Sequence, residues 1–349
     1  MTDSKASSRS EASRNRGLFS RVPPQLTLLV LAPILGELVS CHQTPLEFIN
    51  PLNLLILSLP YGCGALICRE LMIRWRGGGL CLILLGIAYG MYEEGVVVYS
   101  LFDPQWSELG PLARYGYYAG INWTWAVMTV QFHATVSIGS SVALSHMIHS
   151  DRRAQPWLGK RGLALCFAGL LAWIPVMAVI MAVDMKRPFP PLPLYVLACG
   201  MVLALVYAAR RFASCPAPKV ERAPARPWSL FLLGLINMTA VFAGVFIMAE
   251  QATPPLVVTM LLLMSLDMVS LLLLWRWSGY GRGWDDRHRL ALVAGILAFF
   301  VYFSFDKDFE LWRGSSIVGA LTVLSLWRLS RTVYRQPRMS QVETPKLPV

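Results

Sequence analysis

About ten apolar runs follow one another along this chain, and most are close to the length of a membrane-spanning helix. A helix needs about 20 apolar residues to cross the roughly 30 Å hydrocarbon core of a bilayer. Hydrophobic residues make up 55% of the chain and charged residues 15%, and a soluble protein of this length could not bury so much apolar surface. The runs predict an all-α fold, a polytopic integral membrane bundle of about ten transmembrane helices. We expect these helices at residues 25–41, 51–73, 79–101, 121–147, 162–183, 193–209, 228–249, 255–275, 289–304 and 315–330.

The basic residues are distributed unequally between the two sides of this predicted bundle. If the N-terminus lies inside, all but five of the 31 Lys and Arg residues fall in cytoplasmic segments. The positive-inside rule predicts this distribution, with both termini cytoplasmic and the protein in the cell membrane. The net charge of +11 then reflects contact with anionic lipids, and we expect no nucleic-acid partner. The expected partners are membrane lipids and a small molecule or ion, and a membrane-protein partner is possible.

Composition divides the chain into five parts. A Ser- and Arg-rich start is typical of disorder, and a Pro-rich stretch between the sixth and seventh helices is typical of a stiff linker. The seven cysteines have no metal-type spacing, so we expect neither a metal nor another cofactor. The parts are a disordered basic cytoplasmic tail (1–24), helices 1–6 with the candidate site (25–210), a cytoplasmic linker (211–227), helices 7–10 as a scaffold (228–330) and a cytoplasmic tail (331–349).

Two adjacent carboxylates, Glu93 and Glu94, lie deep inside the third apolar run. A charged side chain at the centre of a bilayer costs at least about 2.5 kcal/mol, so ionisable residues there usually have a function. The first four helices contain most of them, whereas the last six contain Asp267 and the neutral Asn237. The candidate substrate- or ion-binding residues are Glu37, Glu93, Glu94, His133, Ser137 and Asp267.

Helical geometry arranges these candidates. Gly86, Gly90 and Glu94 are spaced by four residues and share one face, along which a neighbouring helix can approach closely. Glu93 is rotated by about 100° from Glu94 about the helix axis and shares its face with Tyr89. We therefore expect one carboxylate to face a cavity and the other to pair with a donor on an adjacent helix. The fourth helix has a polar stripe that should face protein or water, formed by Asn122, Thr129, His133, Ser137 and Ser141, with Ser140 and Ser145 nearby.

Several of these residues also have purely structural interpretations. The role of Asp267 can be limited to a hydrogen bond with Asn237 or Ser270 across helices, and Arg69 and Glu70 can form a local ion pair near the cytoplasmic end of their helix. The outer loops contain more acidic than basic residues, which raises the local concentration of cations. The acidic residues there include Asp103, Glu108, Asp306, Asp308 and Glu310.

Short motifs in the first half resemble a group of bacterial multi-pass membrane proteins without an assigned activity. The resemblance implies the architecture and no reaction. It is carried by residues 31–40 (LAPILGELVS), 45–51 (PLEFINP), 61–64 (YGCG), 89–95 (YGMYEEG) and 102–104 (FDP).

A second resemblance rests on Glu93 and Glu94 followed by His133 on the next helix. This pattern is similar to the CAAX-protease and bacteriocin-processing family of intramembrane glutamic proteases, in which a Glu pair and a His activate water. Val98 and Thr129 stand where that family has Arg and Phe.

Two functions follow from these patterns, and scaffold, receptor and lipid-handling roles stay open beside them. The first is a transporter or ion-coupled permease, which binds its substrate or ion at the Glu/Glu/His cluster in the middle-to-outer half of the bilayer. The alternative is an intramembrane hydrolase with Glu93, Glu94 and His133 as catalytic residues, in which a Glu deprotonates water and His133 stabilises the developing charge. A polar path that reaches both faces favours transport, and a one-sided vestibule favours hydrolysis.

Overall fold

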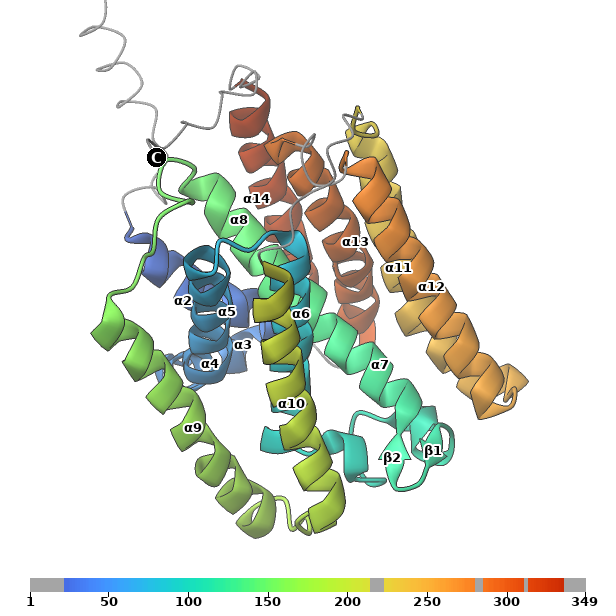
Figure 1. Ribbon diagram of the computed structural model, residues 1–349. Helices are drawn as coiled ribbons and strands as arrows, with labels where there is room; N and C mark the ends of the chain where they lie inside the picture. Colours follow the sequence, from blue (N-terminus) through green and yellow to red (C-terminus); the bar gives the residue numbers. More distant parts are fainter. Residues whose placement is uncertain (1–21, 214–222, 280–284, 311–312, 336–349) are drawn as a thin grey trace, which may run out of the picture.

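The computed structural model describes residues 22–213, 223–279, 285–310 and 313–335 of the chain (Figure 1). These residues form a bundle of helices with one short hairpin, so the predicted all-α membrane architecture is confirmed. The first half contains α2 (Pro24–Pro33), η2 (Ile34–Val39), α3 (Pro45–Phe48), α4 (Pro51–Leu57), η3 (Ser58–Gly62), α5 (Cys63–Arg74), α6 (Gly79–Met91), η4 (Tyr92–Val97), η5 (Ser100–Phe102), η6 (Gly110–Arg114), β1 (Tyr117–Tyr118), β2 (Ile121–Asn122), α7 (Trp123–Phe132), η7 (His133–Ser140) and α8 (Ser141–Ile148).

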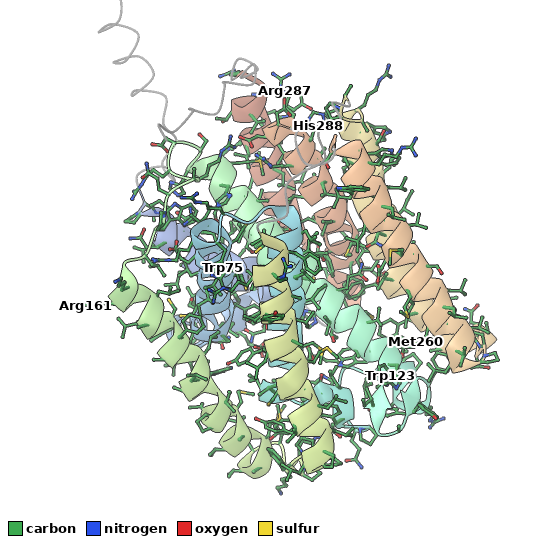
Figure 2. All side chains as sticks on the ribbon, in the orientation of Figure 1. Trp75, Trp123, Arg161, Met260, Arg287 and His288 are labelled. Carbon is green, nitrogen blue, oxygen red and sulfur yellow. The ribbon has the colours of Figure 1, made fainter. Side chains whose placement is uncertain are left out.

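The second half consists of longer and more regular helices. They are α9 (Lys160–Val183), α10 (Leu192–Ala213), α11 (Pro227–Ile247), η8 (Met248–Ala252), α12 (Leu256–Trp277), α13 (Asp286–Glu310) and α14 (Ser315–Arg335). The antiparallel strands β1 and β2 lie at one end of the bundle. We call this end the hairpin face, and it is the end that the charge distribution predicts to be outside. Trp123 and Met260 lie towards it, whereas Arg287 and His288 lie at the opposite end (Figure 2).

Eight helices in the described residues are long and apolar enough to cross a membrane. The first predicted helix is shorter, at Pro24–Val39, and the tenth corresponds to α14, which is not one of the eight. Several predictions were wrong at their ends: the third helix stops at Val97 and not at residue 101, and the ninth and tenth continue to Glu310 and Arg335, past residues 304 and 330. Most of the predicted tails and residues 214–222 of the linker lie outside the described residues, so the functional division of the chain stays a prediction.

Small residues allow the helix that carries Glu93 and Glu94 to pack closely against the next one. A Cβ on Gly86 would lie 2.9 Å from the Cα of Ala134, and a Cβ on Gly90 would lie 2.9 Å from the Cα of Val130. The glycine stripe therefore faces α7 and η7, which places Glu94 opposite His133. Glycines also permit close backbone contact between α11 and α13, where a Cβ on Gly295 would lie 2.0 Å from a backbone oxygen.

Arg69 and Glu70 form a fully buried ion pair, with 2.5 Å between Nη1 and Oε1, which confirms the predicted local pairing. The guanidinium also donates to the backbone oxygens of Arg153 and Gln155, at 2.9 and 2.7 Å. The Glu70 carboxylate accepts a hydrogen bond from the Trp157 backbone amide at 2.7 Å. The pair thus fastens the loop after α8 to α5, and its role is structural.

Candidate functional site

Four π-helical segments hold four of the polar residues that the sequence selects, together with one further residue, Tyr61. Glu37 lies on η2, Tyr61 on η3, Glu93 and Glu94 on η4, and His133 on η7. A π-helix accommodates an extra residue in a helix and occurs frequently at functional sites. Two of the segments have a local cause, because η2 directly follows Pro33 and η3 contains Pro60, and proline interrupts the regular hydrogen-bond ladder of a helix.

Glu94 and His133 form a buried pair at the centre of this arrangement. Their side chains are 2.9 Å apart between Oε1 and Nε2, and the two residues are 9% and 3% exposed. The other ring nitrogen, Nδ1, lies 3.2 Å from the Ser137 hydroxyl. Both nitrogens of the imidazole are therefore engaged, Nε2 with a carboxylate and Nδ1 with a hydroxyl.

The second oxygen of Glu94 accepts a hydrogen bond from the Ser100 hydroxyl. Ser100 in turn accepts a hydrogen bond from Nε1 of Trp125 at 2.9 Å. Tyr99 makes this possible, because its left-handed backbone conformation (φ 41°) reverses the chain after η4. Such a conformation costs about 1–3 kcal/mol and persists where its surroundings enforce it; Tyr99 is 4% exposed.

Two tyrosine rings flank the imidazole of His133. The ring centroids of Tyr61 and Tyr89 lie 5.9 and 5.6 Å from it. Glycines make room for both rings, since a Cβ on Gly36 would lie 2.5 Å from Tyr61 and a Cβ on Gly64 would lie 2.2 Å from Tyr89. The aromatic surroundings exclude bulk water and strengthen the electrostatic interactions inside the site.

Glu93 is buried beside this pair without a complete set of partners. Its Oε2 atom and the hydroxyl of Tyr89 have no hydrogen-bond partner among the described residues. In native proteins a buried polar atom of this kind usually bonds to water or a ligand. Glu93 is therefore the carboxylate that remains available, and Glu94 is the one that pairs across helices.

Glu37 joins the cluster from the side of η2. Its carboxylate interacts with the Tyr61 hydroxyl and lies within electrostatic range of His42 and His133. No Lys or Arg in the described ranges forms an ion pair with Glu37, Glu93 or Glu94. Three carboxylates in an apolar environment, of which Glu94 is the one that bonds to His133, require protons or a bound cation to limit the cost of their charge.

Asp267 belongs to a different polar group. The Asn237 side-chain amide donates to it at 3.2 Å and to the Ser270 hydroxyl at 3.1 Å. Gln131 donates to the oxygen of Asn237 at 2.5 Å. This group joins α7, α11 and α12 through hydrogen bonds, and it shares no bond with Glu94 or His133. The structure thus brings together Glu37, Glu93, Glu94, His133 and Ser137, and it separates Asp267 from them.

Three further residues complete the cluster without having been identified from the sequence: Ser100, Trp125 and Tyr61. Ser100 lies at the end of an apolar run, where a hydroxyl is usual, so nothing in its position indicates a bond to Glu94. Trp125 gives a weak signal, since its spacing from Thr129 and His133 places it on the polar stripe. Within the described part of the chain, no three His, Cys, Asp or Glu side chains are grouped as metal ligands.

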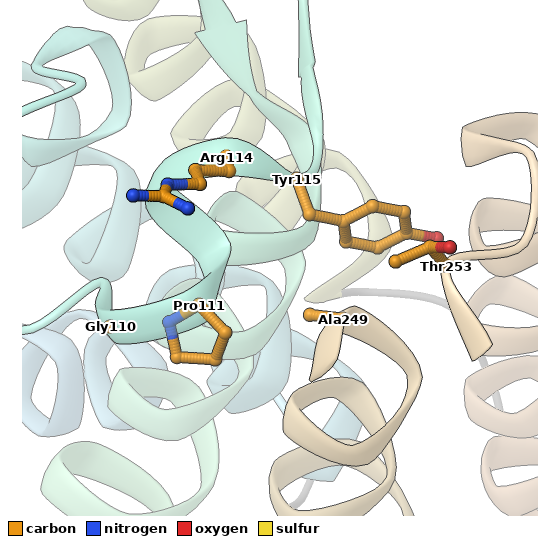
Figure 3. A pocket seen from close by; sticks show the side chains of 6 residues that line it. All are labelled: Gly110, Pro111, Arg114, Tyr115, Ala249 and Thr253. Atoms are coloured by element: carbon orange, nitrogen blue, oxygen red, sulfur yellow. The ribbon is translucent and has the colours of Figure 1, made fainter. Parts of the chain in front are cut away.

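A separate pocket of about 530 Å³ opens at the hairpin face (Figure 3). It is lined by Pro111, Arg114, Tyr115 and Thr253, among others, and by none of the clustered residues. The Tyr115 side chain extends towards Thr253, whereas Arg114 points away from it (Figure 3). The pocket is therefore distinct from the candidate site.

Comparisons with known proteins place the chain in the membrane-protein class. A model of an uncharacterized membrane protein family matches residues 26–327. This match covers most of the chain and gives no support to the similarity with CAAX proteases. No curated protein and no solved structure matches the chain.

Proposed function

We propose that this chain, which belongs to an uncharacterized membrane protein family, is a transporter coupled to protons or another cation. The proposed binding centre consists of Glu93, Glu94 and His133, with Glu37 and Ser137 at its sides. The substrate is a small molecule or ion, and the proposed location is the cell membrane, where lipids surround the bundle.

The observation that carries this proposal is a polar stripe that continues from the centre towards the end opposite the hairpin face. The stripe follows η7 and α8 at intervals of four residues, and its members are at most 3% exposed. The hydroxyls of Ser141 and Ser145 lack hydrogen-bond partners among the described residues. His149 closes the stripe and lies 2.9 Å from the Thr27 hydroxyl. The members are His133, Ser137, Ser141, Ser145 and His149.

Unpartnered hydroxyls in a row favour water or a passing polar group inside the bundle. On the opposite side, Glu37 and Ser100 extend the polar surface of the centre towards the hairpin face. Polar groups therefore run in both directions from the Glu94–His133 pair. Access from two sides is what a transporter needs, and a hydrolase needs only one.

The chemistry of the pair fits ion coupling. A hydrogen bond between a carboxylate and an imidazole nitrogen holds one proton, and a second proton or a cation changes the net charge of the centre. When this second positive charge leaves the centre, the attraction between Glu94 and His133 weakens, and the Glu94 carboxylate can bind the substrate. Oε2 of Glu93 has no hydrogen-bond partner among the described residues, and the substrate or cation can bind to it while Glu94 is paired with His133.

The test compares cells that produce the wild-type protein with cells that produce the double variant Glu93→Gln/Glu94→Gln at the same membrane level. Cellular contents of metabolites and metal ions are measured by mass spectrometry after growth in one defined medium. We expect at least one solute to differ between the two strains, and the variant to resemble cells without the protein. Asp267→Asn is the matched control, because it removes an intramembrane carboxylate outside the centre. Identical solute profiles for wild-type and double-variant cells would contradict the proposal.

The unpartnered oxygen of Glu93 beside the Glu94–His133 pair also fits a general base that activates water. This is the observation that favours the alternative, an intramembrane glutamic protease or hydrolase. It predicts that Glu93→Gln abolishes a cleaved membrane-protein fragment that the wild-type protein produces. An unchanged membrane proteome in this variant, together with an altered solute profile, would decide for transport.

A further inference from the structure

Two buried polar atoms beside the Glu94–His133 pair lack a hydrogen-bond partner in the described part of the chain. They are Oε2 of Glu93 and the hydroxyl of Tyr89, and their residues are 7% and 4% exposed. Tyr89 lies one helical turn before Glu93 on the same face, so the two side chains are close enough to interact. A buried polar atom without a partner is unfavourable, and two of them side by side indicate a place for a small polar ligand.

Two neighbouring polar side chains are already bonded elsewhere. Both carboxylate oxygens of Glu94 are engaged in hydrogen bonds. The Tyr92 hydroxyl donates to the backbone oxygen of Leu170 on α9 at 2.6 Å. A ligand beside Glu93 therefore meets one carboxylate oxygen and one hydroxyl, that of Tyr89, with which it can form new bonds.

Aromatic rings surround these two atoms. The ring centroid of Tyr89 lies 6.4 Å from that of Tyr61 and 6.1 Å from that of Tyr92. The Glu93 carboxylate is within electrostatic range of all three tyrosines. The face of an aromatic ring is partly negative and attracts cations, and the ring also offers apolar surface to carbon atoms. The rings and the carboxylate together favour a positively charged organic ligand.

The same atoms favour an ammonium group over a metal ion. An ammonium group donates N–H bonds, and the Glu93 oxygen and the Tyr89 oxygen can each accept one. A metal ion needs several oxygen, nitrogen or sulfur ligands. In the described ranges, no three His, Cys, Asp or Glu side chains are grouped to hold one. Aromatic rings supply no such ligand atoms, whereas they do attract ammonium groups.

We propose that Glu93 and Tyr89 bind the ammonium group of a small primary amine, which is the substrate or the coupling cation of this protein. One N–H bond goes to Oε2 of Glu93 and a second to the Tyr89 hydroxyl oxygen, and the rings of Tyr61 and Tyr92 lie beside the ligand. The positive charge of the ammonium group compensates the buried negative charge of Glu93. This inference rests on the proposed function, for which it names the class of substrate.

The experiment measures the melting temperature of the purified protein in lipid nanodiscs with a series of primary alkylammonium chlorides, from methylammonium to butylammonium. A ligand that binds only the folded state raises the melting temperature in a concentration-dependent way. Sodium chloride at the same ionic strength is the control for salt, and tetramethylammonium chloride is the control for a cation without N–H donors. We expect at least one primary amine to raise the melting temperature, and both control salts to leave it unchanged.

Two conservative variants locate the bound amine. Glu93→Gln should weaken amine binding at least about tenfold and Tyr89→Phe about two- to tenfold, since each removes a hydrogen bond to the ammonium group. Without amine, Tyr89→Phe should keep or raise the melting temperature, because it deletes a buried hydroxyl that has no partner among the described residues. A tyrosine with only a structural role would not combine unchanged stability with weaker amine binding.

Two further variants are the matched controls. Tyr92→Phe removes the hydrogen bond to Leu170, so it should lower the melting temperature without amine and leave the affinity for amine unchanged. Asp267→Asn removes an intramembrane carboxylate outside the centre and should also bind the amine like the wild-type protein.

The inference and the proposed function can fail separately. The inference would be overturned if no amine of the series raised the melting temperature, if tetramethylammonium raised it equally, or if Glu93→Gln bound the amine as tightly as the wild-type protein. Amine binding that depends on Glu93, together with identical solute profiles in wild-type and double-variant cells, would contradict transport and leave the amine site in place.

Discussion

Nε2 of His133 lies 2.9 Å from Oε1 of Glu94, and the two residues are 39 positions apart in the sequence. Both are buried inside an apolar bundle, where neither is stable alone. Their contact is possible because Gly90 lets η7 approach within a distance that no larger side chain would allow. The small size of Gly90 thus allows Glu94, one turn further along the same helix, to pair with His133.

The Glu94–His133 pair should show energetic coupling. We expect Glu94→Ala and His133→Ala to destabilise the protein singly, and the double variant to lose less than the sum, with a coupling of about 0.5–3 kcal/mol. The reason is that each single change leaves a buried polar group without its partner. Thermal unfolding followed by circular dichroism in detergent measures this. Additive losses would show that the pair contributes nothing as a unit.

Trp125 and Trp123 should differ in the effect of the same substitution. Trp125→Phe removes the indole donor to Ser100, which is buried and supports Glu94. We expect a loss of about 1–3 kcal/mol, because the buried Ser100 oxygen loses its donor. Trp123→Phe removes an exposed bond to the backbone of Tyr118 and is the matched control. Equal effects of the two variants on stability would argue against an ordered Ser100–Glu94 bond.

Gly90 and Gly200 form a second matched pair within transmembrane helices. A Cβ at position 90 meets the backbone of Val130 at 2.9 Å, whereas a Cβ at position 200 has no heavy atom within 4 Å. Gly90→Ala should force the helices apart, cost about 1–3 kcal/mol and impair function by displacing His133. Gly200→Ala should keep or raise stability, because alanine favours a helix by up to about 1 kcal/mol. Melting temperatures of the two variants in the same micelles decide the matter.

Glu70→Gln should destabilise the protein strongly, although Glu70 is remote from the candidate site. The change leaves the fully buried Arg69 guanidinium without its counter-charge, which costs about 3–5 kcal/mol. We also expect the loop after α8 to become sensitive to proteolysis, since Glu70 binds the amide of Trp157. The control is Asp286→Asn, which weakens the partly exposed pairs with Arg153 and Arg289 and should cost about 0–1 kcal/mol for each pair. Protease resistance equal to that of the control would contradict this assignment.

The sequence was sufficient to predict the helices and the location of the cluster. All ten predicted helices begin within three residues of those observed, since hydrophobic length alone identifies a membrane-crossing segment. The four-residue spacing of Gly86, Gly90 and Glu94 indicated which face is closely packed. The cost of placing a charge inside the bilayer indicated which ionisable residues are candidates for a functional site.

The details of the cluster could not be predicted in the same way. The π-helical segments, the reversal at Tyr99 and the bond from Ser100 to Glu94 depend on neighbours from other helices. Asp267, like Glu94, is an acidic residue inside an apolar run, but it bonds within a different group of polar residues. The neighbours of Asp267 in the folded bundle, and not its own chemistry, determine which polar group it joins.

The sequence by itself determined that this protein is a bundle of membrane helices with costly polar groups in its first half. Only the tertiary structure decided which of those groups meet, that Glu94 pairs with His133, and that Glu93 keeps an oxygen without a partner. The physical reason is that helical periodicity specifies the direction of a side chain about its own axis. The identity of the residue that it meets depends on which helix packs there, and that choice is made by close packing across the whole bundle.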